Sequence, residues 1–131
     1  MASIFSKIVA GEIPCYKVAE TEHCLAFLDI NPVQKGHVLC IPKQEVDYLF
    51  DMESEAYAEL MMFARRVALG LKKVCPCRKV GVAVIGLDVP HTHVHLVPLQ
   101  EVHDLDFSHH VKMTPDELQA LATEIGQAVG I

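Results

Sequence analysis

The chain has 131 residues, of which 51% are hydrophobic and 21% charged, a composition typical of a single globular domain over residues 1–131. Its formal net charge of −6 argues against binding to duplex nucleic acid or an anionic membrane surface, and no apolar stretch reaches the roughly 18 residues of a membrane span. Five scattered cysteines, with no signal-peptide pattern at the N-terminus, predict a cytoplasmic protein with reduced thiols.

The first part of the chain predicts one short helix followed by three strands. Apolar residues recur at helical spacing within 3–9, and Gly11 is suited to ending that helix. The alternating segments that follow predict strands at 17–20, 24–28 and 37–41, the last ended by Pro42. Because their connections are short, we expect these strands to pair antiparallel.

Residues 54–74 predict a long amphipathic helix that begins at a Ser54 cap. One face carries its apolar residues, namely Tyr57, Leu60, Met61, Ala64, Val67, Ala68 and Leu71. We assign Cys75-Pro76-Cys77 to the end of this helix, because a single Cys-X-Cys pair is a weak metal or redox signal.

Two more strands and a final helix complete the predicted elements. Residues 80–87 are almost entirely apolar, so we expect a strand covered on both faces, and residues 93–99 predict a fifth strand. Residues 114–117 form a capping box with proline at the first helical position, ahead of a helix that buries Leu118, Leu121, Ala122, Ile125 and Val129. The expected fold is an α+β domain: a five-stranded, mainly antiparallel sheet with the long helix packed on it, plus short N-terminal and C-terminal helices.

Three histidines occupy alternate positions just before and within the start of the fifth predicted strand. Because a strand has a period of two, His91, His93 and His95 should share one face, opposite Thr92, Val94 and Leu96. Three imidazoles in a row are a costly way to build an ordinary core. Besides that ordinary role, two kinds of chemistry suit them: a metal site with an open position, and nucleophilic catalysis on phosphorus.

A nucleophilic imidazole needs one free ring nitrogen, while the other donates a hydrogen bond that fixes the tautomer. A backbone carbonyl commonly accepts that bond. Neighbouring histidines can donate to phosphoryl oxygens and handle the proton of the leaving group. The middle residue, His93, has a neighbour on each side and is our candidate nucleophile.

The segment His91-Thr92-His93-Val94-His95-Leu96-Val97 resembles the signature of the histidine triad (HIT) family. Three further blocks look like parts of the same family: residues 4–14, 25–32 and 36–43. With the triad they span residues 4–98 in the family's order. The resemblance implies hydrolysis or transfer of a nucleotidyl group at an α-phosphorus, acting on a purine nucleoside phosphoramidate or a dinucleoside polyphosphate. It also implies a homodimer.

Carried over by position, the resemblance makes His93 the nucleophile of a nucleotidyl-histidine intermediate, with His91 and His95 contacting the phosphate or the leaving group. Asp29 would bind the ribose hydroxyls. An apolar slot for the base would consist of Phe5, Ile8, Phe27 and Ile30. Read without the family, the apolar residues would be ordinary core and Asp29 a turn residue.

The sequence departs from the family pattern at two places. Some members have a histidine shortly after the Pro-Lys pair and, if they hold zinc, a cysteine near the N-terminus, where this chain has Glu45 and Ser6. We therefore predict no structural zinc and no cofactor, although Glu45 could hydrogen-bond an imidazole. Leu87 and Asp88 stand near an expected glutamine of the phosphate loop, which puts substrate choice in doubt.

The departures keep other interpretations open. One alternative function is a nucleotide-binding module with little catalysis, and another is a metal-dependent hydrolase that uses the three histidines. Residues 100–113, which contain three more histidines, could cover the active site or a partner subunit, but we favour an exposed loop.

Overall fold

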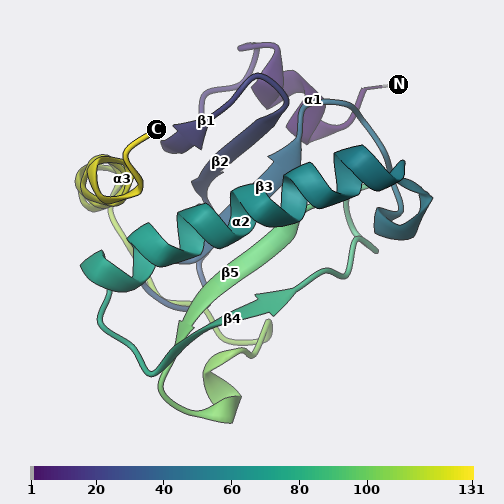
Figure 1. The fold of residues 1–131 in the computed structure, drawn as a ribbon. Coiled ribbons are helices and arrows are strands. Elements are labelled where there is room, and N and C mark those ends of the chain that lie inside the picture. The colour runs from purple at the N-terminus through teal and green to yellow at the C-terminus, as the bar shows by residue number, and fades with distance from the viewer. Residues whose placement is uncertain (1) are drawn as a thin grey trace.

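A computed structural model describes residues 2–131, and its core is a five-stranded sheet in the order β1-β2-β3-β5-β4 (Figure 1). Every neighbouring pair in the sheet is antiparallel. The strands are β1 Lys17–Glu20, β2 Cys24–Leu28, β3 Val38–Pro42, β4 Lys79–Ala83 and β5 Val94–Leu99. The helices are α1 Ile4–Val9, α2 Ser54–Val74 and α3 Pro115–Val129, with short 3-10 turns at Leu49–Asp51 and Val102–Asp104. The expected α+β fold is confirmed.

The long helix α2 crosses one face of the sheet, and α3 lies beside β1 at the edge (Figure 1). Alternate strand residues such as Ala26, Cys40 and Leu96 point into the layer under α2 and are fully buried. The apolar stripes of α2 and α3 close this main core, as their helical spacing predicts. Among residues 2–131, no helix has the length and apolar character needed to cross a bilayer.

The opposite face of the sheet carries a smaller apolar cluster under the short helix α1. Its buried members are Phe5, Leu25, Phe27, Leu39 and Ile41. Because side chains alternate along a strand, His37 and His95 lie on this face too, next to Leu39. The face away from α2 is therefore the one that carries the histidines.

The expectation that residues 80–87 form a strand covered on both faces is wrong. The strand β4 ends at Ala83 and lies at the edge of the sheet, where its only neighbour is β5. Val82, Ile85 and Leu87 are 54%, 50% and 88% exposed. The apolar composition of this segment reflects an uncovered edge, not a buried central strand.

Several predicted boundaries shift by one residue. Glu53 is the N-cap of α2 without a side-chain bond, so Ser54 is the first helical residue and does not cap the helix. The strand β3 includes Pro42, and β5 begins after His93. The capping box ahead of α3 is confirmed, with Thr114 and Glu117 each accepting from the other's backbone.

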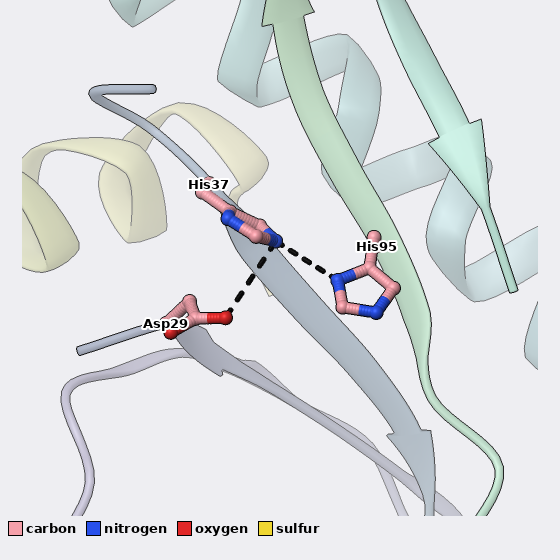
Figure 2. A group of neighbouring side chains, drawn as sticks. All are labelled: Asp29, His37 and His95. Carbon is pink, nitrogen blue, oxygen red and sulfur yellow. Dashed lines mark hydrogen bonds and ion pairs between the residues drawn. The ribbon is translucent and has the colours of Figure 1, made fainter. Parts of the chain in front are cut away.

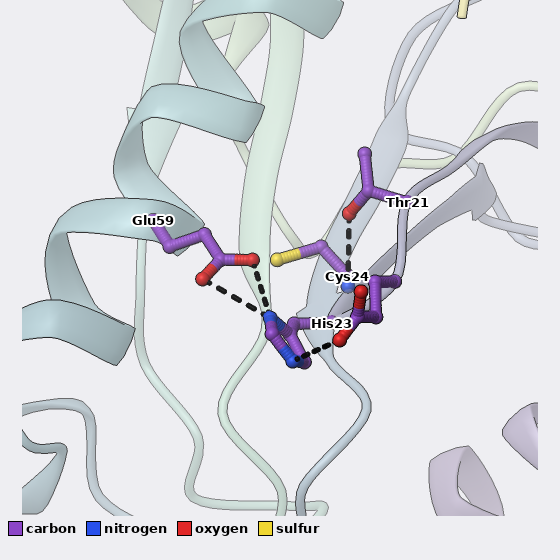
Figure 3. A network of polar contacts seen from close by, with 5 residues as sticks. Thr21, His23, Cys24 and Glu59 are labelled. Carbon is purple, nitrogen blue, oxygen red and sulfur yellow. Dashed lines mark hydrogen bonds and ion pairs between the residues drawn. The ribbon is translucent and has the colours of Figure 1, made fainter.

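The turn between β1 and β2 is tied to α2 by polar contacts (Figure 3). His23 Nδ1 lies 2.9 Å from a carboxylate oxygen of Glu59, and its Nε2 lies 3.1 Å from Glu22. The Thr21 hydroxyl accepts from the Cys24 amide at 3.1 Å. All five cysteines are free thiols, in agreement with the expectation of no disulfide framework.

Candidate active site

The three histidines of the predicted row lie where β5 begins. His91 and His93 precede the strand, and His95 stands opposite Leu39 of β3. The segment is anchored from the other side by Thr92, whose amide and hydroxyl both donate to the Val46 carbonyl at 2.7 Å. The alternation that the sequence predicts therefore holds, although only His95 belongs to the strand.

His93 has the tautomer that a nucleophilic imidazole needs. Its Nδ1–H donates to the backbone carbonyl of His91 at 2.7 Å, so the neutral ring carries its lone pair on Nε2. That atom has no hydrogen-bond partner in residues 2–131, and since no buried polar side-chain atom there lacks a partner, it reaches solvent. The Phe5 ring packs edge-on against His93, with centroids 4.9 Å apart.

His95 is oriented by His37, which the sequence left without a role. The Val33 amide donates to His37 Nδ1 at 3.1 Å, so the proton of the neutral His37 ring sits on Nε2. His37 Nε2–H then donates to His95 Nδ1 at 2.9 Å. The neutral His95 ring must therefore carry its own proton on Nε2, and this ring lies beside His93, with the two ring centroids 4.9 Å apart.

Both of these rings are neutral near pH 7. Burial lowers the pKa of His37 to about 4, and it lowers the pKa of His95 to about 4 as well. Each ring also feels the other nearby histidines, which oppose a positive charge in the same small volume. Their hydrogen bond is therefore one between neutral rings with a fixed direction.

Asp29 directly follows β2, and its carboxylate points toward the same His37 nitrogen that faces His95 (Figure 2). Its Oδ2 is 3.7 Å from His37 Nε2, too long for a hydrogen bond, and its Oδ1 accepts from the Asn31 amide at 2.8 Å. Burial raises the pKa of Asp29 above its usual value. Within residues 2–131, one carboxylate oxygen of Asp29 is thus left without a close donor.

His91 is fully buried, and both of its ring nitrogens are engaged. Nε2 lies 2.8 Å from the Pro42 carbonyl, which can only accept, so Nε2 carries the proton. Nδ1 then accepts from the Ser3 hydroxyl at 2.9 Å. In this arrangement His91 has no nitrogen left for a phosphate or a leaving group.

Glu45 lies close to His91 but does not bond to its ring. Its Oε1 accepts from the Ser3 amide at 2.6 Å and from the Ser6 hydroxyl at 2.7 Å. These bonds lower the pKa of Glu45 to about 2. Glu45 therefore does not bond to the His91 imidazole directly; it bonds to Ser3, whose hydroxyl bonds to His91. Two hydroxyls, one carboxylate and an imidazole with both nitrogens engaged do not fit a zinc ion, which prefers cysteine and histidine.

A second group of potential metal ligands is formed by Asp29, His37 and His95 (Figure 2). A metal there would have to take the nitrogens that His37 and His95 already share in their 2.9 Å bond. It would also displace the His37 proton that the Val33 amide holds on Nε2. This corner therefore does not fit a metal ion, and it does not support the metal-dependent hydrolase.

The residues expected to form a slot for the base are brought together except for one. Phe5 and Phe27 are buried with ring centroids 5.7 Å apart, and Ile8 packs against the same cluster. Ile30 is 74% exposed in the turn after Asp29. Leu87 and Asp88, in the doubtful phosphate loop, are both exposed.

The segment 100–113 is largely exposed, as favoured, but it also covers part of the histidine face. The Phe107 ring packs edge-on against His95 with centroids 4.9 Å apart, and it lies 6.2 Å from His37. The Val111 amide donates to the Pro32 carbonyl at 2.8 Å, and His110 Nδ1 lies 2.8 Å from the Asn31 carbonyl. The favoured expectation of an exposed loop therefore holds for most of the segment, and the alternative of cover over the histidines applies at Phe107.

Sequence reasoning missed three groups that set this geometry: His37, Ser3 and Phe107. His37 alternates with Leu39 and Ile41, so the sequence places all three on one face of the sheet. This indicates contact with His95 only if β3 and β5 are known to be neighbours. Ser3 was visible only as the start of a helix. No local pattern marked Phe107.

Comparison with known proteins gives one consistent result. The family model described as HIT domain matches residues 10–102. A curated relative from Schizosaccharomyces pombe, named adenosine 5'-monophosphoramidase hnt1, is 35% identical over 98% of this chain and 99% of its own length. Among solved structures, a Hit-like protein from Bartonella henselae aligns with a TM-score of 0.84 and 27% identity, over 96% of this chain and 95% of that one. A Zn-bound histidine triad family protein from Mycobacterium smegmatis aligns with a TM-score of 0.83 and 27% identity, over 98% and 94% of the two chains.

Proposed function

The chain belongs to the HIT family, and we propose that it is a nucleotide hydrolase that cleaves a purine nucleoside 5'-phosphoramidate at its phosphorus. The observation that carries this proposal is the state of His93: Nδ1–H is bound to the His91 carbonyl and Nε2 is free. The name of the S. pombe relative supports the choice of a phosphoramidate over a dinucleoside polyphosphate.

The proposed reaction has two steps through a nucleotidyl-histidine intermediate. In the first, the Nε2 lone pair of His93 forms a bond to phosphorus while the phosphorus–nitrogen bond of the substrate breaks, and the departing amine takes a proton from solvent. The His91 carbonyl stabilises the positive charge that develops on the ring, and His95 Nε2–H donates to a phosphoryl oxygen. In the second step water attacks phosphorus and gives a proton to solvent, the bond between phosphorus and His93 Nε2 breaks with its electron pair returning to Nε2, and the nucleotide leaves.

Binding of the nucleoside is proposed for the residues around this centre. The Phe5, Ile8 and Phe27 side chains offer an apolar wall beside His93, and Ile30 stands in the turn that follows. The carboxylate oxygen of Asp29 that lacks a close donor suits two vicinal ribose hydroxyls. With a net charge of −6, the protein must bind phosphate through such local donors instead of its overall field.

The test is a substrate panel scored for release of AMP or GMP, with an adenosine phosphoramidate and a dinucleoside polyphosphate as the first two members. His93→Ala should lose turnover by several orders of magnitude, while an exposed control such as His103→Ala should keep it. Rapid quenching with labelled substrate should trap the nucleotidyl group on the wild-type protein. Full activity of His93→Ala, or nucleotide binding without turnover on any substrate, would overturn the proposal.

We also propose that two copies of the chain associate through the edge strand β4. That edge has unpaired backbone groups, and exposed apolar side chains lie on it and beside it, namely Val82 of β4 and Leu69 of α2. An antiparallel edge can pair with its own copy about a twofold axis, which buries these side chains and satisfies both edges. Light scattering should give twice the 14.5 kDa chain mass, and Val82→Lys should reduce it to one. A monomeric wild-type protein would refute this.

We further propose the cytoplasm as the compartment of this protein, because the five free thiols suit reducing conditions.

A further inference from the structure

Four polar residues meet at the corner between α1, the end of β3 and the segment before β5. They are Ser3 and Ser6 from the start of α1, Glu45 from the loop after β3, and His91. Ser3 and His91 are buried, with 7% and 0% of their surfaces exposed. They come from three separate parts of the chain, so the fold itself assembles this cluster, which we call the serine corner.

The hydrogen bonds of the serine corner run in one direction. The Ser3 hydroxyl accepts from the Ser6 amide at 3.0 Å and donates to His91 Nδ1 at 2.9 Å. The Ser6 hydroxyl lies 3.4 Å from the same nitrogen, but it donates to Glu45 at the shorter distance of 2.7 Å. Glu45 therefore occupies the competing hydroxyl and leaves Ser3 as the donor to His91.

The serine corner is linked to the nucleophile through the backbone. The His91 ring is fixed at both nitrogens, by Ser3 and by the Pro42 carbonyl. A ring held at both ends limits the rotation of its own peptide unit, and the carbonyl of that unit accepts from His93 Nδ1 at 2.7 Å. The same corner secures α1, a helix of six residues that is too short to be stable alone and that carries Phe5 against His93.

We propose that Glu45, Ser3 and His91 are positioning residues for His93 and do not contact substrate. The proposal rests on the proposed function insofar as His93 is the nucleophile. It gives His91 a role different from the phosphate contact that the family resemblance implies, because both of its nitrogens are already used. Hydrogen bonds among two hydroxyls, a carboxylate that accepts them and an imidazole hold this corner, and this set of ligand atoms does not fit zinc.

The first test separates positioning from substrate binding. Ser3→Ala and Glu45→Ala should lower kcat for the adenosine phosphoramidate by roughly tenfold to a hundredfold, with KM changed less than about twofold. Ser3→Thr retains the hydroxyl and should restore most of the kcat. Glu12→Ala, which removes an exposed carboxylate just after α1, is the matched control and should behave as wild type. A rise in KM with unchanged kcat would overturn the proposal.

The second test needs no turnover, so it distinguishes this proposal from the proposed function. Nitrogen NMR of the free protein reports the tautomer of each ring. In the wild type, His93 should carry its proton on Nδ1 and His91 on Nε2. In Ser3→Ala and Glu45→Ala, the His93 signals should shift toward a mixture of tautomers. Unchanged His93 signals in both variants, or a His91 ring whose signals respond directly to added AMP while those of His93 do not, would refute the positioning role.

Discussion

The Nε2 atom of His37 lies 2.9 Å from Nδ1 of His95, and this bond joins two rings that are 58 residues apart in the chain. The direction of the bond originates at a backbone amide, because Val33 N–H occupies the other nitrogen of His37. A main-chain group thus decides that the proton of the neutral His95 ring sits on Nε2.

Removing the donor of His37 should impair catalysis without blocking binding. In His37→Leu, Nδ1 of His95 loses its partner and the ring can adopt the wrong tautomer. We expect kcat for the phosphoramidate to fall by roughly a hundredfold, within the range typical of acid–base partners. His37→Gln keeps an amide donor and should lose less. Equal kcat values for His37→Leu and wild type would contradict the claim that His37 fixes the catalytic tautomer of His95.

Acidification should destabilise the protein before its surface carboxylates titrate. His37 and His95 have pKa values of about 4 in the folded protein, below the ordinary 6.5, so the unfolded chain binds more protons between these values. The free energy of unfolding should therefore fall as pH decreases from about 6.5 to 4, by on the order of a few kcal/mol. Urea denaturation at pH 7, 6 and 5 measures this. The exposed-site variant His103→Gln should follow the wild-type curve, and a stability that does not change over the range would be inconsistent with two buried neutral rings.

Phe107 should keep water away from the paired rings. Its ring packs against His95 at a centroid distance of 4.9 Å although it belongs to a largely exposed segment. Phe107→Ala should let water reach His95 and raise the pKa of both rings from about 4 toward 6.5, which a proton NMR titration can follow. Val102→Ala, at a 94% exposed position of the same segment, is the control. Titration curves that coincide for Phe107→Ala and wild type would show that the ring does not shield the site.

Asp29 should matter for affinity more than for chemistry. Loss of charge-assisted hydrogen bonds to ribose in Asp29→Asn should raise KM about tenfold to a hundredfold and leave kcat nearly unchanged. Because burial raises the pKa of this carboxyl, its ionised form opposes folding at neutral pH, and the variant should be no less stable. Wild type and Asp29→Asn should have similar KM values for a 2',3'-dideoxy substrate, because it lacks both ribose hydroxyls. If loss of the hydroxyls raises KM as much in Asp29→Asn as in wild type, Asp29 does not bind the ribose.

The contact between α2 and α3 leaves no room for a side chain at Gly70. A Cβ there would stand 2.8 Å from the backbone nitrogen of Val129 and 2.9 Å from its Cα. Gly70→Ala should lower the free energy of unfolding by about 1–3 kcal/mol, in spite of its better helix propensity. Thermal denaturation measures the change, and Ala58→Gly on the exposed side of α2 gives the propensity effect alone. An increase in stability for Gly70→Ala would mean that α3 adapts freely.

Local patterns in the sequence were enough for most of the fold. The helical spacing of α2 and α3 and the capping box at Thr114 follow from neighbouring residues, and so does the shared face of His93 and His95. The exposure of residues 80–87 could not be predicted, because an apolar composition does not distinguish a central strand from a strand at the edge of the sheet.

The hydrogen bonds of the site were beyond local patterns. His91 bonds to Ser3 across 88 positions and to Pro42 across 49, so its two occupied nitrogens depend on contacts that only the folded chain creates. Spacing showed which histidines share a face, but it could not show which of their nitrogens are free. The different roles proposed for His93 and His91 rest on those hydrogen-bond partners.

The sheet divides its two faces very unequally between helices: α2, with 21 residues, covers one side, while α1, with six, accompanies the histidines on the other (Figure 1). The larger part of the apolar interior, which lies under α2, is therefore separate from the face that carries the histidines. Substitutions at Phe107, Ile30 or the Leu87 loop can accumulate without disturbing the packing under α2. Residues on the histidine face can therefore change while the residues that pack under α2 stay the same.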